Sequence, residues 1–199
     1  MKQISINGTS RADLGKKASK ELRKNGNVPC VLYGEKRDEN GNPVAVHFYA
    51  SEREINKLYF TPNIYLVDLK IDGEDHKAVM REVQVHAVKD NVHHVDFYEV
   101  TETKPIVMGV PVFAKGLAEG VRAGGRLMMM VRKLNVKALY SQIPENLEID
   151  VTSLARGKSI KAGSLSFEGL ELVTPKEVIV CTVKMTRAAM GAAAAAAKA

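Results

Sequence analysis

The sequence predicts a mainly β protein with a few helices (α+β), in which a small N-terminal β-barrel with helices precedes a β-rich C-terminal domain. Two observations support this fold class. Short apolar runs of strand length alternate with turn residues along the chain, and only two segments of the first hundred residues have a helical pattern. The 199 residues, 45% of them hydrophobic, suffice for one large domain or two domains of about 100 residues.

The first hundred residues have the pattern of a small barrel with five or six strands. Apolar runs predict strands within residues 3–11, 28–34, 44–49, 64–85 and 92–100. The fourth segment is long enough for a hairpin, with its turn at Asp72-Gly73. The polar residues between the second and third segments are expected to turn at Asn40-Gly41.

Two segments among these strands are predicted to be helices. Residues 16–26, KKASKELRKNG, end at Gly26 with Pro29 shortly after, which is a usual helix stop. Residues 51–60 begin with Ser51 and Glu54, the residues of a capping box. We expect both helices at the side or the end of the barrel.

The second half of the chain predicts a different domain. Residues 101–105, TETKP, have no apolar period and are the expected linker after a barrel domain at 1–100. Residues 106–187 contain six further apolar runs and predict the β-rich domain, with a glycine-rich loop, GLAEGVRAGGRL, between the first two runs. Residues 188–199 are Ala-rich and of low complexity, so we expect a flexible tail.

The positive charge is unevenly distributed. The formal net charge is +6, yet residues 1–100 hold 15 basic and 15 acidic residues, whereas residues 101–199 hold 14 and 8. Basic residues are dense in two places: seven within 1–24, and six within 115–137 against Glu119 alone. Such local excess favours an acidic partner such as nucleic acid.

Several functional classes are disfavoured by the composition. Cys30 and Cys181 each lie in an apolar run, which predicts buried free thiols in a reducing cytosol rather than a disulfide. No Cys/His spacing indicates zinc, and no motif indicates another metal or a cofactor. The chain lacks an apolar signal region at its start and any apolar run of the roughly 20 residues that a membrane span needs. We therefore expect a cytoplasmic protein without a membrane partner.

The stretch VHHVDFYEV, residues 92–100, holds an unusual set of polar side chains. Alternation along a strand puts His94, Asp96 and Tyr98 on one face and His93, Val95 and Phe97 on the other, more apolar face. The polar row could serve catalysis, hold a metal, or bind a polar partner. A hydrolase using His94 and Asp96 stays an alternative, although no GxSxG motif and no third ligand accompany them. Nucleic-acid binding fits better, because Asp accepts from base amino groups and Tyr can stack.

The first helix has a basic side. If its first turn reaches back to Leu14, then Leu14, Ala18 and Leu22 form an apolar side. The opposite side carries Lys16, Ser19, Lys20, Arg23 and Lys24. This side is either an ordinary solvated face or a surface for phosphates. GVRAGGRL, residues 120–127, has the same ambiguity, since it is either a phosphate cradle or simply a glycine-rich hairpin loop.

Four segments in order resemble one known family. They are SRADLGKKASKELRKNGNVPCVLYG, REVQVHAVKDNVHHVDFYEV, GVRAGGRL and PENLEIDVTSL. Together they resemble the 5S-rRNA-binding, general-stress (Ctc) family of bacterial large-subunit ribosomal proteins, in its long two-domain form. The resemblance covers residues 1 to about 185. It implies a structural constituent of the ribosome, not an enzyme, whose barrel binds the loop E region of 5S rRNA in the central protuberance.

The resemblance also implies partners and contact residues. Neighbouring ribosomal proteins or 23S rRNA are possible partners of the C-terminal domain. The barrel type is shared with an anticodon-binding domain, so a tRNA-binding accessory module is the alternative function. The implied RNA contacts are Arg11, Lys16, Ser19, Lys20, Arg23, Tyr33, Gln84, His86, His94 and Asp96.

Two positions depart from the family pattern. Lys20 stands where Arg is usual, which keeps the charge and loses bidentate hydrogen bonding. Val85 stands where the short form often has a basic residue, so Gln84 and His86 are the expected contacts there.

Overall fold

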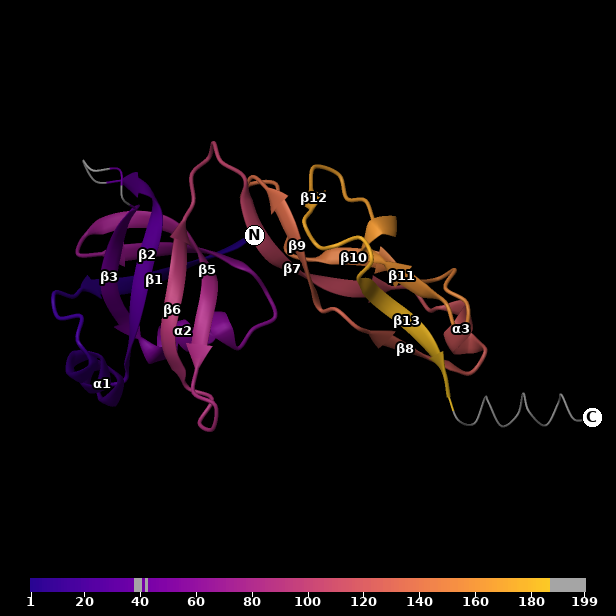
Figure 1. Ribbon diagram of the computed structural model, residues 1–199, viewed down its shortest axis with the longest axis horizontal. Helices are drawn as coiled ribbons and strands as arrows, with labels where there is room; N and C mark the ends of the chain where they lie inside the picture. Colours follow the sequence, from indigo (N-terminus) through magenta and orange to yellow (C-terminus); the bar gives the residue numbers. More distant parts are fainter. Residues whose placement is uncertain (38–40, 42, 187–199) are drawn as a thin grey trace, which may run out of the picture. The chain divides into compact units, whose positions relative to one another are not determined.

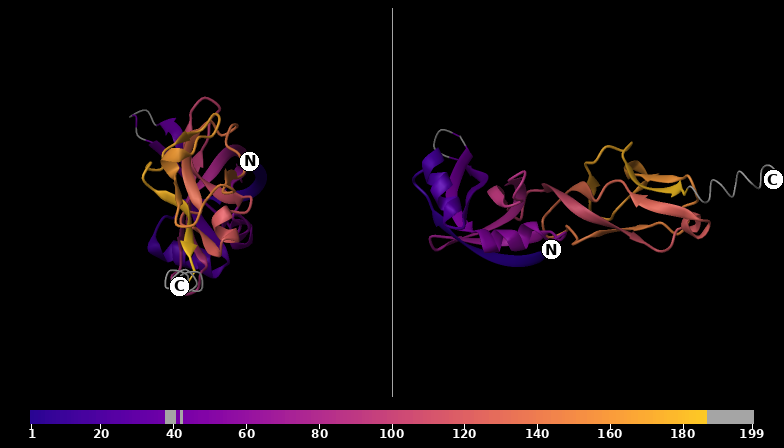
Figure 2. Two further views of the ribbon diagram at one scale, coloured as in Figure 1. Left: turned by 90° about the vertical axis from the view of Figure 1, so that its right-hand side faces the viewer. Right: turned by 90° about the horizontal axis from the view of Figure 1, so that it is seen from below.

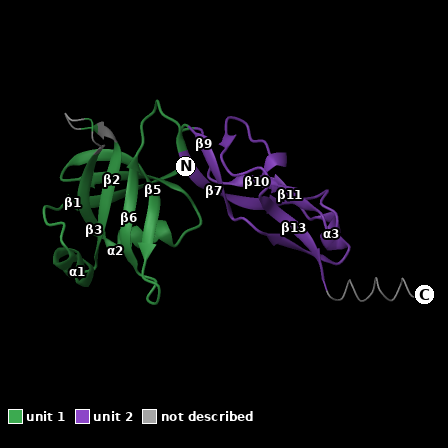
Figure 3. Cartoon of the chain, viewed as in Figure 1, with its two compact units in different colours: residues 1–106, 139–141 green, residues 107–138, 142–199 purple. Residues whose placement is uncertain are grey.

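The computed structural model describes residues 1–37, 41 and 43–186 and divides the chain into two compact units (Figure 3). Unit 1 comprises Met1–Ile106 and Leu139–Ser141, and unit 2 comprises Val107–Ala138 and Gln142–Ala199. The Asn40-Gly41 turn and the Ala-rich tail predicted from the sequence lie outside the described residues, except for Gly41 itself. The predicted class, mainly β with few helices, is confirmed.

Unit 1 is a closed six-stranded barrel (Figure 1). Its strands are β1 (Lys2–Ser10), β2 (Asn27–Arg37), β3 (Pro43–Ser51), β4 (Tyr65–Ile71), β5 (Glu74–Val85) and β6 (Val92–Glu99). They follow the order β1-β3-β2-β6-β5-β4 around the barrel. Two neighbouring pairs, β1 with β4 and β2 with β6, are parallel. The strongly curved β1, indigo in Figure 2, closes the barrel because it pairs with β4 and also with β3.

The barrel interior is a continuous apolar core. Phe48 on β3 and Phe97 on β6 lie in it with ring centroids 5.9 Å apart, and both are fully buried. Val95 on β6 and Cys30 on β2 belong to the same cluster. Burial of this kind contributes roughly 25 cal/mol per Å² of apolar surface. Every member of the cluster comes from residues before the predicted linker.

The helices α1 (Lys16–Lys24) and α2 (Glu52–Tyr59) and the hairpin turn form where the sequence predicts them. At the turn, Asp72 and Gly73 both have positive φ, 50° and 95°, as an Asp-Gly hairpin requires. The predicted capping box is wrong, because the Ser51 side chain makes no cap hydrogen bond to α2. The start of α2 is instead fixed by a backbone bond, from the Glu52 N–H to the Gly26 carbonyl at 3.0 Å.

Unit 2 contains two sheets. The first has the order β10-β7-β9-β12 and the second the order β11-β13-β8. The strands are β7 (Ile106–Lys115), β8 (Gly125–Met129), β9 (Lys133–Ala138), β10 (Leu147–Asp150), β11 (Ser159–Lys161), β12 (Glu171–Leu172) and β13 (Ile179–Met185). A short 3-10 helix, η1 (Ala162–Ser164), follows β11.

The glycine-rich segment of unit 2 is not only a loop, since it contains a short helix, α3 (Glu119–Arg122). Two of its glycines are required by close packing. A Cβ added to Gly120 would lie 2.6 Å from the Arg156 backbone nitrogen, and one added to Gly125 would lie 2.6 Å from the Gly120 carbonyl oxygen. The glycines therefore let α3, β8 and the loop at Arg156 approach one another.

None of the helices in the described part of the chain combines the length and the apolar character of a membrane span. Both cysteines are free and buried, as the sequence predicts. Burial raises the pKa of the Cys30 thiol far above its ordinary value of 9.0, and it also raises the pKa of Cys181.

We predict that the stabilising effect of Cys30 diminishes above pH 9. The folded thiol keeps its proton, whereas the unfolded thiol ionises near its ordinary pKa of 9.0, so rising pH stabilises only the unfolded state. The difference in unfolding free energy between wild type and Cys30→Ala should therefore fall by about 1.4 kcal/mol per pH unit above that value. Urea unfolding at pH 8, 9 and 10 measures it. A constant difference would show that the thiol ionises equally in both states.

The boundary at 101–105 stays a prediction, and we propose that the barrel folds without unit 2. All six barrel strands and both of their helices end before residue 100. A fragment of residues 1–103 should therefore give a β-rich circular dichroism spectrum and a cooperative thermal transition. A fragment of residues 1–90, which lacks β6, is the control and should not fold. An unfolded 1–103 fragment would contradict the proposed boundary.

Candidate nucleic-acid interface

The outer face of β6 carries the polar row that the sequence predicts. His94, Asp96 and Tyr98 are half-buried, whereas Val95 and Phe97 are fully buried in the core. The alternation holds along this part of the strand because β6 is paired on both sides, with β2 and β5. The row thus lies at the centre of a three-stranded wall of the barrel (Figure 1).

His93 is the exception to the predicted alternation. Gln84 pairs with His94 while Val85 pairs with Val92, so His93 is an extra residue in β6, a β-bulge. Val92 takes the core position that His93 was expected to share with Val95 and Phe97. The prediction for His93 is therefore wrong, because alternation cannot continue through a bulge.

The bulge gives α1 its attachment point on the barrel. Arg23, in the last turn of α1, donates from Nε to the His93 carbonyl oxygen at 3.1 Å. The His93 ring meets the His86 ring edge-on, with centroids 5.1 Å apart. Burial lowers the pKa of His93, and the neighbouring Arg23 charge and the His86 ring lower it further, which favours the neutral ring. The end of α1 is thus held at the start of β6.

The sides of α1 differ from the predicted ones. Leu14 precedes the helix and is 54% exposed, so it does not extend an apolar side. Ser19 and Arg23 were expected on the open side, but they are half-buried together with Ala18 and Leu22. All four of these side chains therefore lie on the side of the short helix that faces the barrel, because Arg23 bonds to β6. The exposed basic residues of α1 are Lys16, Lys17, Lys20 and Lys24, and we call these the α1 lysines.

Arg11 and Ser19, two predicted RNA contacts, lie together before and within α1. Arg11 Nη2 donates to Ser19 Oγ at 3.0 Å and to the Asp13 carbonyl at 2.8 Å. The Arg11 backbone N–H donates to the His47 carbonyl on β3 at 3.0 Å. These bonds hold the segment that enters α1 against the barrel, with the guanidinium at the helix start.

Asp96 lies among polar neighbours from two strands. Its Oδ1 is 2.8 Å from His94 Nδ1, an ion-pair distance at an angle unsuited to a hydrogen bond. Glu82 on β5 is directly opposite Asp96, and Gln84 is directly opposite His94. Two carboxylates side by side repel each other, so this part of the wall favours hydrogen-bond donors from outside.

Aromatic side chains border the carboxylates on the same wall. Tyr33 on β2 pairs with Tyr98 on β6, and their rings meet at 73° with centroids 5.9 Å apart. The Arg81 guanidinium lies over the Tyr98 ring, 5.8 Å from its centroid. Sequence reasoning missed Arg81 and Glu82 as site residues, although both open the family segment REVQVHAVKDNVHHVDFYEV. A register shift between Met80 and Glu82 brings them to this wall, and the sequence gives no sign of that shift.

His86 differs from the other predicted contacts, because its ring supports a turn. Its Nδ1 accepts from the backbone N–H groups of Val88 at 3.1 Å and Lys89 at 3.3 Å. These bonds fix the connection between β5 and β6. The structure therefore brings Tyr33, Gln84, His94 and Asp96 onto one wall, with Arg11, Ser19 and the α1 lysines on the segment beside it.

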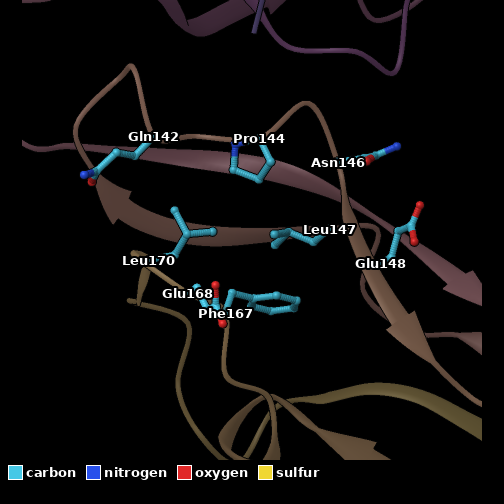
Figure 4. Close-up of a pocket in the computed structure, with 8 residues that line it drawn as sticks. All are labelled: Gln142, Pro144, Asn146, Leu147, Glu148, Phe167, Glu168 and Leu170. Atoms are coloured by element: carbon cyan, nitrogen blue, oxygen red, sulfur yellow. The ribbon is translucent and has the colours of Figure 1, made fainter.

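The hydrolase alternative would need a metal site, or a nucleophile in a pocket. The described residues contain no group of three or more His, Cys, Asp or Glu that could hold a metal ion. A pocket of about 260 Å³ in unit 2 has a mixed lining, half polar and half apolar (Figure 4). Its apolar lining residues are Pro144, Leu147, Phe167 and Leu170. Glu148 at its edge is already paired with Lys115 at 2.8 Å, and no Ser, Cys or His lines the pocket.

Comparisons with known proteins give consistent relatives. The Ribosomal L25p family matches residues 6–97, and the family described as ribosomal protein TL5, C-terminal domain, matches residues 105–187. The large ribosomal subunit protein bL25 of Phocaeicola vulgatus is 60% identical over 198 residues, covering 100% of both chains. That of Bacteroides thetaiotaomicron is 53% identical over 203 residues, again covering 100% of both. That of Porphyromonas gingivalis is 50% identical over 194 residues, covering 97% of this chain and 98% of its own.

We predict that Arg23 stabilises the fold and that Lys20 does not. Removing the Arg23 guanidinium breaks its bond to the His93 carbonyl, and a hydrogen bond of this kind contributes about 0.5–1.5 kcal/mol. Arg23→Ala should lower the free energy of unfolding by about that amount. Lys20→Ala removes an exposed cation from the same helix and should change it by less than about 0.5 kcal/mol. Urea unfolding compares the two, and equal values would exclude the proposed attachment.

Proposed function

Because the chain belongs to the ribosomal L25p family, we propose that its barrel binds 5S rRNA, at the loop E region, through the α1 lysines and the outer wall of β2, β6 and β5. The chain is a structural constituent of the large ribosomal subunit in the bacterial cytoplasm, and it is not an enzyme. The RNA partner and the contact residues are the parts that we propose. The observation that carries them is the bond from Arg23 to the His93 carbonyl, which joins the α1 lysines to the β6 wall.

The α1 lysines supply affinity. Four exposed ammonium groups on a nine-residue helix attract phosphates and release counterions from the RNA. Such contacts position a protein on nucleic acid but do not discriminate between sequences. The helix is positioned accurately because both ends are anchored, by Arg11 near its start and by Arg23 at its end.

The β6 wall supplies recognition. Asp96 and Glu82 are acceptors in a protein that binds a polyanion, so they belong opposite base edges rather than phosphates. Base amino and imino groups are donors that satisfy a carboxylate, as occurs at the exposed edge of an unpaired or non-canonically paired base. Tyr33 and Tyr98 offer aromatic faces or hydroxyls to a base or a ribose 2′-hydroxyl beside that edge.

We predict that Asp96→Asn weakens binding to 5S rRNA. The amide keeps one acceptor oxygen and places donors against base donors, which leaves polar groups unpaired at about 1–3 kcal/mol. This corresponds to roughly a tenfold to hundredfold higher Kd at fixed salt. Filter binding to a 5S rRNA transcript measures it, with circular dichroism as the test of folding and a tRNA transcript as the unrelated RNA.

The matched control is Asp68→Asn. Asp68 is also half-buried, but it lies on β4, which β5 separates from β6 in the barrel. Removing its negative charge should leave binding unchanged or slightly tighter. If Asp96→Asn binds 5S rRNA as tightly as wild type or tighter, Asp96 does not contact a base edge. Equal affinity of wild type for the tRNA transcript would overturn the choice of 5S rRNA.

A further inference from the structure

Five basic side chains surround α3 in unit 2, and the barrel interface uses none of them. They are Arg122, Arg126, Arg156, Lys158 and Lys184, and we call them the α3-end surface. They come from α3, β8, β13 and the segment that leads into β11, which lie side by side (Figure 1).

Specific contacts bring these segments together. Arg156 Nη1 donates to the Ala123 carbonyl at the end of α3 at 3.1 Å. The Lys158 carbonyl accepts from the Val183 backbone N–H on β13 at 3.1 Å. The close approach of Gly120 to the Arg156 backbone holds α3 against the same segment. The surface is therefore built on packed elements rather than on a free loop.

Two of the cations are direct cross-strand neighbours. Arg126 on β8 pairs with Lys184 on β13, and both side chains are exposed. In the next pair along the two strands, Val183 is buried and Leu127 is half-buried. Like charges placed directly opposite each other destabilise a sheet. An anion that lies over the pair would relieve this repulsion.

Three lysines elsewhere in unit 2 are paired with carboxylates. Lys115 is 2.8 Å from Glu148, Lys137 is 3.1 Å from Glu171, and Lys161 is 2.8 Å from Glu177. Within the described ranges, no carboxylate lies within ion-pair distance of any side chain of the α3-end surface. Among the described residues, Glu119 at the start of α3 forms no ion pair with Arg122 at the end of the same helix. The positive charge here is left for an external partner.

The chemistry of the surface indicates what that partner is. The neighbouring hydroxyls are already used, since Ser159 Oγ donates to Thr182 Oγ1 at 2.9 Å and Thr182 Oγ1 donates to the Lys158 carbonyl at 3.2 Å. The remaining side-chain donors of the α3-end surface are cationic. Such a surface matches the regular phosphates of a nucleic-acid backbone.

We propose that the α3-end surface binds the phosphate backbone of a second ribosomal RNA segment, apart from the 5S rRNA at the barrel. The chain would then connect two RNA segments of the large subunit. The barrel reads one segment through base edges, and unit 2 holds the other through its charges. An acidic protein is the competing class of partner, and the test below separates the two.

The test uses the full chain and two pairs of substitutions with the same net charge. Arg126→Gln with Lys184→Gln removes the unneutralised cross-strand pair. Lys137→Gln with Lys161→Gln removes two lysines that are already neutralised by glutamates. Binding to a 23S rRNA transcript is measured over a series of salt concentrations, with and without a saturating 5S rRNA transcript.

We expect wild type and the Lys137/Lys161 variant to bind 23S rRNA alike, also when 5S rRNA is bound. The Arg126/Lys184 variant should bind 23S rRNA at least about fivefold more weakly at 0.1 M salt. Its slope of log K against log salt should be shallower by about 1.4–1.8, which corresponds to two lost phosphate contacts. Its affinity for 5S rRNA and its Tm should not fall below those of the control variant.

Two results would overturn the proposal. If both double variants lose the same affinity for 23S rRNA, only the net charge of the chain matters. If both bind 23S rRNA as tightly as wild type, the surface does not contact RNA, and an acidic protein is the remaining class of partner. A Lys16→Gln, Lys20→Gln variant separates this proposal from the barrel's function, because it should weaken 5S rRNA binding and leave the effect of Arg126 and Lys184 on 23S rRNA intact.

Discussion

The hydrogen bond from Arg23 to the carbonyl of His93 is the interaction on which the proposed barrel interface depends. It exists because β6 contains a bulge that turns the His93 carbonyl away from the regular ladder and toward α1. The short helix α1 has no fully buried residue, so its attachment depends on this bond and on the Arg11 contacts near its start. With these contacts, the α1 lysines stand at a fixed distance from the half-buried carboxylate and tyrosines of the β6 wall.

The two units arrange their charged side chains differently. Unit 1 places its carboxylates beside its cations, so its affinity for a polyanion depends on placing Asp96 and Glu82 opposite donors. That dependence is a source of specificity, because an RNA lacking those donors leaves two carboxylates unpaired. At the α3-end surface, unit 2 separates its cations from its carboxylates. Such a surface contributes affinity without reading sequence.

The sequence predicts those features that depend on local patterns. Alternating apolar residues locate the strands of the barrel, and Asp72-Gly73 locates a hairpin turn because only a few residues tolerate positive φ. Strand alternation also places Asp96 and Tyr98 correctly on the outer face. These predictions need only the neighbours of each residue along the chain.

Features that depend on a partner strand cannot be predicted from local sequence patterns. The bulge at His93 is defined by the register with β5, and it changes which residue enters the core. Arg81 and Glu82 join the interface through another shift in the same ladder. The helix sides of α1 were misjudged for a similar reason, because an arginine that bonds to a distant carbonyl faces the barrel rather than the solvent.

Directed hydroxyl-radical probing of 5S rRNA tests the central claim most directly. An iron chelate attached to Lys20→Cys would lie on α1, and the buried Cys30 and Cys181 would not compete for the reagent. The same chelate on Lys70→Cys, an exposed position on β4, is the reference. The account predicts strong cleavage within the loop E region from position 20 and weak cleavage there from position 70. Equal cleavage from both positions, or none from position 20, would contradict it.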